Sequence, residues 1–266
     1  MAKVGLIAGG GQLPLEFISS AKREGDTVVV FAIEGMAGPD VGSGADRVYW
    51  LNIGQFQKCF FLLLRNRIRK VAFLGKVDKN VIYQKKTADK TTRDTLEKSK
   101  SKNDYAILEE ISKRLAFFGI EVIDSVRYLR HLLPEKGVLS ATSPNREIEE
   151  DITFGFDVAK KLAGLDIGQT LVVKDKTVVA VEAMEGTDQT IRRAGDIAGE
   201  GCVMVKVSRP HQDFRWDVPT VGPGTIERLV EAGFSALAIE SERMFFVERD
   251  KCMEIADSAG IVVKAL

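Results

Sequence analysis

The stretch RPHQDFRWDVPTVG, residues 209–222, carries charged side chains at every second position. They are Asp213, Arg215 and Asp217, with bulky apolar residues between them. If residues 213–218 run extended, alternate side chains point to opposite faces, so the two carboxylates and the guanidinium share one face. Mg²⁺ accepts carboxylate oxygens beside substrate phosphates, and arginine can hold a phosphate through two parallel hydrogen bonds. This reading predicts metal-assisted phosphate chemistry, with both aspartates as catalytic metal ligands and Arg215 as a phosphate contact.

The same spacing suits a purely structural role equally well. An acid, a base and an acid in step can form an ion-pair ladder on an edge strand, while Phe214, Trp216 and Val218 anchor the other face in the core. A helix is disfavoured here because Pro210 and Pro219 bracket the segment. The spacing alone leaves both readings open.

Glycines at a predicted helix entrance lie close to this stretch. Thr220 and Gly222 lead into a helical pattern that starts at Thr225, and Lys206 ends a strand-like run upstream. Glycines before a helix leave backbone N–H groups free to point at a bound anion. The alternative is a plain glycine turn capped by Thr225.

A second helix entrance carries an excess of acidic residues. Glu182, Glu185 and Asp188 gather there, and Arg192 follows on the predicted helix. Thr187 or Asp188 would serve as an ordinary cap residue, which is the structural alternative. The entrance has more carboxylates than capping requires, and this favours a binding role.

The first glycine-rich loop joins a strand-like run to a helical pattern at residues 9–14, GGGQLP. A dinucleotide fingerprint starting at Gly9 fails, because Pro14 stands where the third glycine should be. Pro14 suits the first turn of a helix, so the loop is better read as a phosphate or sugar cradle. Gly75 and Lys76 follow another strand-like run, where open α/β sheets bind ligands, although a solvated lysine is the alternative.

The elements that must position these residues alternate between strand and helix, which predicts an α/β fold. We expect an N-terminal Rossmann-like domain with a mostly parallel sheet at residues 1–133, a linker at 134–147, and a catalytic α/β domain with a mixed sheet at 148–266. Expected strands lie at 3–8, 27–33, 47–51, 71–74, 120–123, 170–173, 177–181, 202–207, 236–239 and 261–264. Expected helices lie at 13–24, 54–67, 105–118, 148–162, 187–198, 225–232 and 247–258.

Composition narrows the class of protein. The chain has 266 residues, of which 45% are hydrophobic, and 38 basic residues balance 38 acidic ones. A net charge of zero provides no basic field for nucleic acid. Three scattered cysteines suit reduced thiols, and two histidines without a GxSxG motif disfavour a serine or cysteine triad. A polar, lysine-rich segment at 84–103 reads as a solvated surface or as a basic lid near an anionic substrate.

The expected location is the cytoplasm. A strand-like run begins at Lys3, so we expect no signal peptide. The longest apolar run, residues 59–64, ends at Arg65, well short of a membrane span.

Taken together, four motifs resemble the LpxI family of UDP-2,3-diacylglucosamine pyrophosphatases, in order and over essentially the whole chain. They are GGGQLP at 9–14, GKV at 75–77, EAMEGTD at 182–188 and QDFRWDVPTVG at 212–222. The resemblance implies Mg²⁺-dependent hydrolysis of the substrate diphosphate to UMP and 2,3-diacylglucosamine 1-phosphate (lipid X), in lipid A synthesis. The essential aspartate of the family matches Asp213 or Asp217, and we favour Asp213.

The candidate substrate-binding residues follow from the motifs and their neighbours. They are Gly10, Gly11, Gln12, Leu13, Gly75, Lys76, Glu185, Gly186, Thr187, Asp188, Gln189, Arg192, Lys206, Gln212, Thr220 and Gly222. The expected partners are UDP-2,3-diacylglucosamine and lipid X, and not nucleic acid. Peripheral contact with the inner face of the inner membrane and a homodimer both stay open. The alternatives are a non-catalytic nucleotide-sugar or lipid binding protein and an NAD(P)-dependent oxidoreductase.

Overall fold

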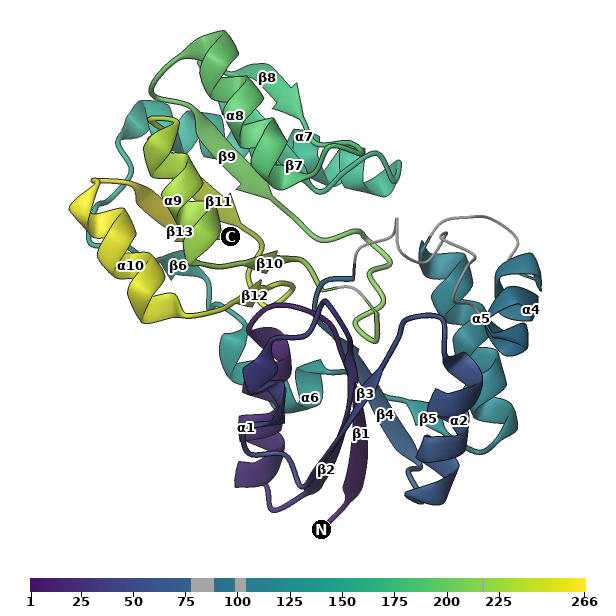
Figure 1. Cartoon of the computed structure of the whole chain (residues 1–266). Helices are drawn as coiled ribbons and strands as arrows, with labels where there is room; N and C mark the ends of the chain where they lie inside the picture. Colours follow the sequence, from purple (N-terminus) through teal and green to yellow (C-terminus); the bar gives the residue numbers. More distant parts are fainter. Residues whose placement is uncertain (78–88, 99–103, 217) are drawn as a thin grey trace. The chain divides into compact units, whose positions relative to one another are not determined.

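The computed structural model describes residues 1–77, 89–98, 104–216 and 218–266 (Figure 1). The chain forms two compact units. One consists of Met1–Arg130 with Asp213–Asp217, and the other of His131–Gln212 with Val218–Leu266. Of the lysine-rich segment expected at 84–103, only residues 89–98 lie inside the described part of the chain.

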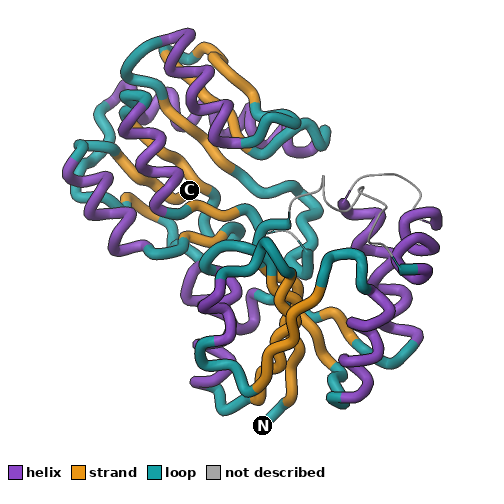
Figure 2. The backbone as a smooth tube through the Cα atoms, in the orientation of Figure 1, coloured by secondary structure: helices purple, strands orange, loops and turns teal. Residues whose placement is uncertain are grey.

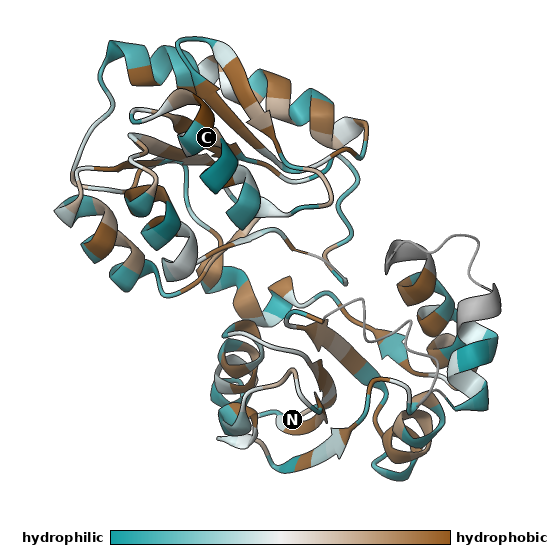
Figure 3. Ribbon diagram, turned by 45° about the horizontal axis from the view of Figure 1, so that its top comes forward, coloured by the Kyte–Doolittle hydropathy of each residue, from teal (hydrophilic) through white to brown (hydrophobic). Residues whose placement is uncertain are grey.

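The first unit is built on a parallel sheet of five strands in the order β3-β2-β1-β4-β5. The strands are β1 (Lys3–Ala8), β2 (Thr27–Ile33), β3 (Arg47–Leu51), β4 (Lys70–Leu74) and β5 (Glu121–Val122). Runs of Val, Ile, Leu and Phe make β1, β2 and β4 strongly apolar, as expected of strands covered on both faces. Figure 3 shows these strands coloured as hydrophobic.

Helices cover both faces of this sheet (Figure 2). They are α1 (Leu13–Arg23), α2 (Phe56–Arg65), α5 (Asp104–Phe117) and α6 (Val126–Leu129), and α4 (Lys90–Lys98) packs beside α2 and α5. On one face α1 packs beside α6, where the rings of Phe17 and Tyr128 meet edge to face at 4.8 Å. On the other face α2 and α5 bury Leu63 and Leu115 against Phe31 of β2. Burying one such side chain stabilises the fold by about 1.5–3 kcal/mol.

The second unit is built on a mixed sheet of six strands in the order β6-β13-β11-β9-β7-β8. The strands are β6 (Gly137–Val138), β7 (Thr170–Lys174), β8 (Thr177–Val181), β9 (Val203–Lys206), β11 (Ala236–Ile239) and β13 (Val262–Ala265). A separate parallel pair consists of β10 (Thr220–Val221) and β12 (Phe245–Phe246). The α/β class, the parallel first sheet and the mixed second sheet expected from the sequence are confirmed.

Alternate residues of the central strands face opposite helical layers in this unit. Val203 and Val205 pack against α7 (Arg146–Gly164), whereas Met204 packs with the layer of α8 (Thr187–Ala198), α9 (Pro223–Glu231) and α10 (Arg249–Ser258). The hairpin between β7 and β8 turns at Asp175 and Lys176, which both have positive φ. The strands expected at 170–173 and 177–181 are therefore confirmed, and they pair as a hairpin.

Three local expectations differ from the structure. The extended run expected from residue 213 is wrong in the described part of the segment, since residues 214–216 form a turn. The stretch expected as a linker contains β6, which pairs antiparallel with β13. Helix α9 begins at Pro223 with Gly222 as its cap residue, so Thr225 lies inside the first turn and does not cap the helix. Within the described ranges, no helix combines the length and apolarity that crossing a membrane requires.

Candidate active site

The first glycine loop lies where the order of the parallel sheet reverses, between β1 and β4. Gly9 to Gly11 follow β1, and Gly75 and Lys76 follow β4. The two loops are joined by paired backbone hydrogen bonds. The Gly10 N–H donates to the Lys76 carbonyl at 2.9 Å, and the Lys76 N–H donates to the Gly10 carbonyl at 2.8 Å. A reversal of this kind is the usual place of a ligand crevice in an open α/β sheet.

The two loops approach so closely that side chains would not fit between them. A Cβ at Gly9 would lie 2.5 Å from the Lys76 carbonyl oxygen, and one at Gly75 would lie 2.7 Å from the Gly10 carbonyl oxygen. Gly75 also has φ +96°, a backbone conformation that residues with a Cβ rarely adopt. The glycines are therefore required by the geometry of the paired loops.

The outer side of this loop pair is open. Gly11, Gln12 and the Lys76 side chain are exposed, while Leu13 is half-buried at the start of α1. Gln12 is the cap residue of α1 and makes no side-chain capping bond, and Pro14 lies in the first turn as predicted. The first amides of α1 and the Lys76 ammonium thus offer positive charge to an anion.

The Asp213–Trp216 turn belongs to the same unit. The Trp216 N–H donates to the Asp213 carbonyl at 3.2 Å, which closes the turn. The Trp216 ring meets Phe73 of β4 at 5.8 Å, and the Ser125 hydroxyl donates to the Phe214 carbonyl at 3.4 Å. Since Phe73 and Ser125 lie at the carboxyl ends of β4 and β5, the turn is held at the sheet edge that carries the glycine loops.

The Asp213 carboxylate organises the turn. It accepts hydrogen bonds from the backbone N–H of Arg215 at 3.1 Å, from Arg215 Nε at 2.9 Å and Nη2 at 2.6 Å, and from Trp216 Nε1 at 2.8 Å. The Arg215 guanidinium lies 5.0 Å above the Trp216 ring. An aspartate whose carboxylate accepts hydrogen bonds from residues two and three positions ahead stabilises a turn in preference to a strand. For this reason the prediction of an extended segment is wrong.

Asp213 and Arg215 each stabilise the charged form of the other. The hydrogen bonds from Arg215 hold the pKa of Asp213 below its usual range, against the opposing effect of partial burial. Asp213 in turn raises the pKa of Arg215, and the negative charge of Asp124 raises it further. Sequence reasoning missed Asp124, although it follows the β5 strand at the carboxyl edge where site residues are expected.

The described residues do not fit a preformed magnesium site. Both Asp213 oxygens already accept hydrogen bonds from Arg215, so a metal would have to compete with the guanidinium for them. Among the residues that the structure describes, no group of three Asp, Glu, His or Cys side chains could hold a metal ion. The second expected ligand, Asp217, lies outside the described residues.

The second unit has a polar cluster of its own at the end of β9. The Lys206 ammonium is buried and donates to the Thr187 hydroxyl at 2.9 Å, and this hydroxyl donates to the Glu182 carboxylate at 2.7 Å. Gly186, and not Thr187 or Asp188, is the cap residue of α8, with φ +81°. Capping by Thr187 or Asp188, the structural alternative, is therefore wrong, and the Thr187 hydroxyl instead links a lysine to a carboxylate.

The acidic entrance of α8 is paired with arginine. The backbone N–H of Glu185 and the Arg193 guanidinium, at 2.7 Å, both donate to the Glu185 carboxylate and hold its pKa below its usual range. Asp188 lies 3.7 Å from Arg228. Gln189 and Arg192 are exposed on the first turns of α8.

The remaining predicted residues of the second unit, Gln212, Thr220 and Gly222, follow Lys206 in the sequence. Gln212 is buried and accepts the N–H of Arg209 at 3.1 Å. The Thr220 hydroxyl donates to the Val218 carbonyl, and Gly222 begins α9. The structure thus distributes the predicted residues over two units. The glycine loops and the 213–217 segment belong to the first, and the other predicted residues belong to the second.

Sequence reasoning also missed a buried acid in the second unit. Glu240 follows β11 directly, accepts the Lys160 ammonium at 2.8 Å, and accepts both the N–H and the hydroxyl of Ser208 at 2.8 Å. Arg243 lies 3.7 Å from the same carboxylate. Its position in the chain could have revealed it. Glu240 comes directly after β11, and Lys206 is the last residue of β9, the parallel strand beside it.

Comparison with known proteins matches both halves of the chain to one family. The LpxI N-terminal domain matches residues 3–132, and the LpxI C-terminal domain matches residues 135–264. A UDP-2,3-diacylglucosamine pyrophosphatase LpxI of Caulobacter vibrioides is 33% identical, over 99% of this chain and 97% of its own length.

Likeness to solved structures is weak by comparison. The biotin carboxylase domain of Hydrogenobacter thermophilus 2-oxoglutarate carboxylase is 15% identical, with a TM-score of 0.29 over 74% of this chain and 41% of that one. The Campylobacter jejuni biotin carboxylase is 12% identical, with a TM-score of 0.29 over 73% and 42%. The chain spans about two fifths of these structures, and likeness at this level carries no argument. The two family matches, the identity over nearly the full length and the positions of the four motifs show that the chain belongs to the LpxI family.

Proposed function

We propose that the protein hydrolyses the diphosphate bond of UDP-2,3-diacylglucosamine, releasing UMP and 2,3-diacylglucosamine 1-phosphate (lipid X). The observation that carries the proposal is the Asp213–Arg215 pair, held at the sheet edge beside the glycine loops in a member of the LpxI family. Such a site suits a phosphoric anhydride, whose hydrolysis needs neutralised phosphates and a positioned water more than a covalent nucleophile.

The first unit supplies groups for phosphate and water. Backbone amides at the start of α1, Lys76 and the Arg215 fork bind phosphate oxygens. Asp213 is a weak base while Arg215 is bonded to it, because those bonds lower its pKa. A substrate phosphate competes for the guanidinium, and as Arg215 turns toward the phosphate the carboxylate becomes more basic and free to orient the attacking water.

The second unit has polar groups of its own. The Lys206–Thr187 pair offers a cation and a hydroxyl, and the entrance of α8, which has no side-chain cap, offers backbone amides beside Glu185. Such groups suit an anionic or polar ligand. A cysteine nucleophile is disfavoured, because burial raises the pKa of Cys252 to about 12 and also raises that of Cys202.

Magnesium dependence is part of the proposal. Mg²⁺ commonly keeps several waters and binds through substrate phosphates with one or two carboxylates, so it needs no preformed cage of protein ligands. It would neutralise the diphosphate when bound. No protein geometry for the metal is assigned, because the Asp213 oxygens are engaged by Arg215.

The test is a direct assay. Purified protein is incubated with UDP-2,3-diacylglucosamine dispersed in detergent, with Mg²⁺ or with EDTA, and UMP is measured. We expect UMP release with Mg²⁺, its loss in EDTA and its recovery when Mg²⁺ is restored. Substrate binding without UMP would contradict hydrolysis and leave a binding protein, and full turnover in EDTA would contradict the metal requirement alone.

A further inference from the structure

The first unit carries an exposed aromatic cluster that the proposed chemistry does not use. It consists of Phe60, Phe61, Leu64, Phe117 and Phe118, and is here called the aromatic face. Phe117 is 85% exposed and Phe61 60% exposed. Large apolar side chains gathered in this way on a surface mark a contact site.

The aromatic face is built by the exposed side of α2 and the end of α5. On α2, Phe60 and Leu64 are four residues apart and Phe61 and Leu64 three apart, so all three lie on one side of the helix. The Phe60 and Phe118 rings lie 6.2 Å apart, and the Phe117 and Phe118 rings meet edge to face at 5.3 Å. The two segments therefore form one continuous surface.

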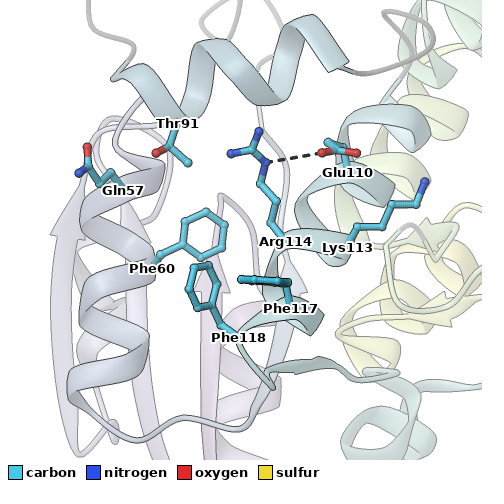
Figure 4. Close-up of a pocket in the computed structure, with 8 residues that line it drawn as sticks. All are labelled: Gln57, Phe60, Thr91, Glu110, Lys113, Arg114, Phe117 and Phe118. Carbon is cyan, nitrogen blue, oxygen red and sulfur yellow. Dashed lines mark ion pairs between the residues drawn. The ribbon is translucent and has the colours of Figure 1, made fainter.

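This surface includes an open pocket of about 450 Å³. Figure 4 shows the rings of Phe60, Phe117 and Phe118 at its base, with Arg114 and Lys113 projecting from α5 beside them. Glu110 also lines the pocket and lies 3.5 Å from Arg114, so an ion pair borders the apolar base.

The surroundings of the aromatic face are basic. Residues 47–70 contain six Lys or Arg and no Asp or Glu. Lys58, Arg65 and Arg67 are exposed there and form no ion pair among the residues that the structure describes. Arg69 reaches the carbonyls of Phe118 and Gly119 at 3.5 Å, at the edge of the face.

The acids next to the face are largely compensated. Glu109 pairs with Lys113 at 2.7 Å, and Glu110 lies 3.5 Å from Arg114. The exposed Glu121 begins β5. The cations of α2 and the loop after it therefore set the sign of the local charge.

We infer that the aromatic face docks the protein on the surface of a bilayer that contains anionic phospholipids. Exposed Phe and Leu inserted at the acyl boundary, with Lys and Arg at the headgroups, is the combination that peripheral membrane binding uses. A second copy of the chain fits less well. A symmetric contact would place the same exposed cations, Lys58, Arg65 and Arg67, opposite each other, and like charges in an interface are unfavourable.

The inference is independent of the catalytic assignment. The experiment uses the full chain and vesicles that contain no nucleotide sugar, either phosphatidylcholine alone or phosphatidylcholine mixed with phosphatidylglycerol. Flotation measures the bound fraction. Wild type should float with the anionic vesicles and much less with neutral ones, and added salt should weaken binding because it screens the cations.

The variants distinguish binding through this face from nonspecific adsorption of exposed apolar residues. Phe61→Ser with Phe117→Ser should lower the vesicle partition coefficient at least about tenfold, since each ring leaves the apolar layer. Lys58→Gln with Arg65→Gln should lower it by about fivefold per charge. The matched control is Leu165→Ser with Ile197→Ser, which removes apolar residues that are 71% and 63% exposed, just after α7 and on α8 respectively. The control should bind as wild type does.

Two outcomes would overturn the inference. One is wild-type protein that stays with the buffer in the presence of anionic vesicles, or that floats equally well after the Phe61 and Phe117 replacements. The other is a dimer in sedimentation that the Phe61 and Phe117 replacements dissociate, without vesicle binding, which would assign the face to self-association. A failure of UMP release in the detergent assay would leave the docking result untouched.

Discussion

Asp213 couples its own ionisation to the position of Arg215. The carboxylate accepts the guanidinium and the indole N–H of Trp216, and these bonds lower its pKa. The turn also places the guanidinium over the indole ring. A phosphate that takes over the arginine therefore changes the basicity of the aspartate at the same moment.

Trp216→Phe tests this coupling. Phenylalanine keeps a ring against Phe73 but loses the N–H that donates to Asp213 at 2.8 Å, so the pKa of Asp213 should rise. If turnover needs the ionised carboxylate, the acid limb of the pH profile of kcat/KM should move to higher pH. Trp50→Phe, at an exposed position on β3, is the matched control and should leave the profile unchanged. An acid limb at the wild-type pH in Trp216→Phe would refute the coupling.

Lys76→Ala tests the phosphate contact after β4. Loss of a charge-assisted hydrogen bond costs about 1.5–3 kcal/mol, so kcat/KM should fall about tenfold or more. Steady-state kinetics are compared with those of Lys3→Ala, an exposed lysine at the opposite, amino end of β1. Equal kinetics in the two variants would make Lys76 an ordinary surface cation.

At the scale of elements, the glycine loops after β1 and β4 are held together by backbone alone. The Gly10–Lys76 hydrogen bonds leave no space for a side chain at Gly9 or Gly75. The position of these loops at the sheet reversal explains why a sequence that fails the dinucleotide fingerprint still has glycines here. The glycines allow the two loops to pair and also leave space for a ligand.

Gly75→Ala should disrupt the loop pair. The added Cβ would meet the Gly10 carbonyl at 2.7 Å, in a residue that already has φ +96°. Gly35→Ala is a control for backbone strain alone, because Gly35 has φ +75° and nothing within 4 Å of the added Cβ. The control should lose about 1–2 kcal/mol of unfolding free energy, and Gly75→Ala should lose more and lose activity as well. Equal melting temperatures and normal turnover in Gly75→Ala would show that the loops can separate without cost.

The long elements were predictable from sequence because their patterns are long. The apolar run of β2 and the helical pattern of α8 were placed with the bounds that the structure has. The strands β6, β10 and β12 have two residues each, too few to show an alternation of apolar and polar side chains. They are defined by pairing with strands far along the chain.

The candidate site was less predictable than the fold. The alternation of charged and apolar residues around Arg215 is typical of a strand. The hydrogen bonds that the Asp213 carboxylate accepts from Arg215 and Trp216 instead stabilise a turn. Asp124 and Glu240 were missed because a single acid at a strand end acquires meaning only once the strand order is known.

On the scale of the whole molecule, each unit has its own hydrophobic core. In the first unit, Asp26 ties the start of the chain to the α6 region. It is buried, accepts the N–H of Ala2 at 2.6 Å and the hydroxyl of Tyr128 at 2.8 Å, and has a lowered pKa. Burial and the neighbouring Asp26 raise the pKa of Tyr128 to about 12.

Asp26→Asn should destabilise the protein in a pH-dependent way. Because folding lowers the pKa of Asp26, its contribution is complete above its unfolded pKa of about 3.9 and is lost as the pH falls through the lower folded value. At neutral pH the variant should lose about 1.5–3 kcal/mol of unfolding free energy. Thermal unfolding at several pH values should show the gap to wild type shrinking in acid. The exposed Asp157→Asn is the control, and a gap that is constant with pH would contradict the assigned ionisation.

The central claim is that Asp213 and Arg215 carry diphosphate hydrolysis, and UMP release by Asp213→Asn tests it most directly. Asparagine keeps the size of the side chain and one acceptor oxygen, but lacks the charge that holds the guanidinium and orients water. With Mg²⁺ and UDP-2,3-diacylglucosamine, UMP release should fall by about 10²-fold or more, while thermal unfolding shows a folded protein. Wild-type UMP release by the folded Asp213→Asn variant would contradict the account and leave the turn as a structural ion pair.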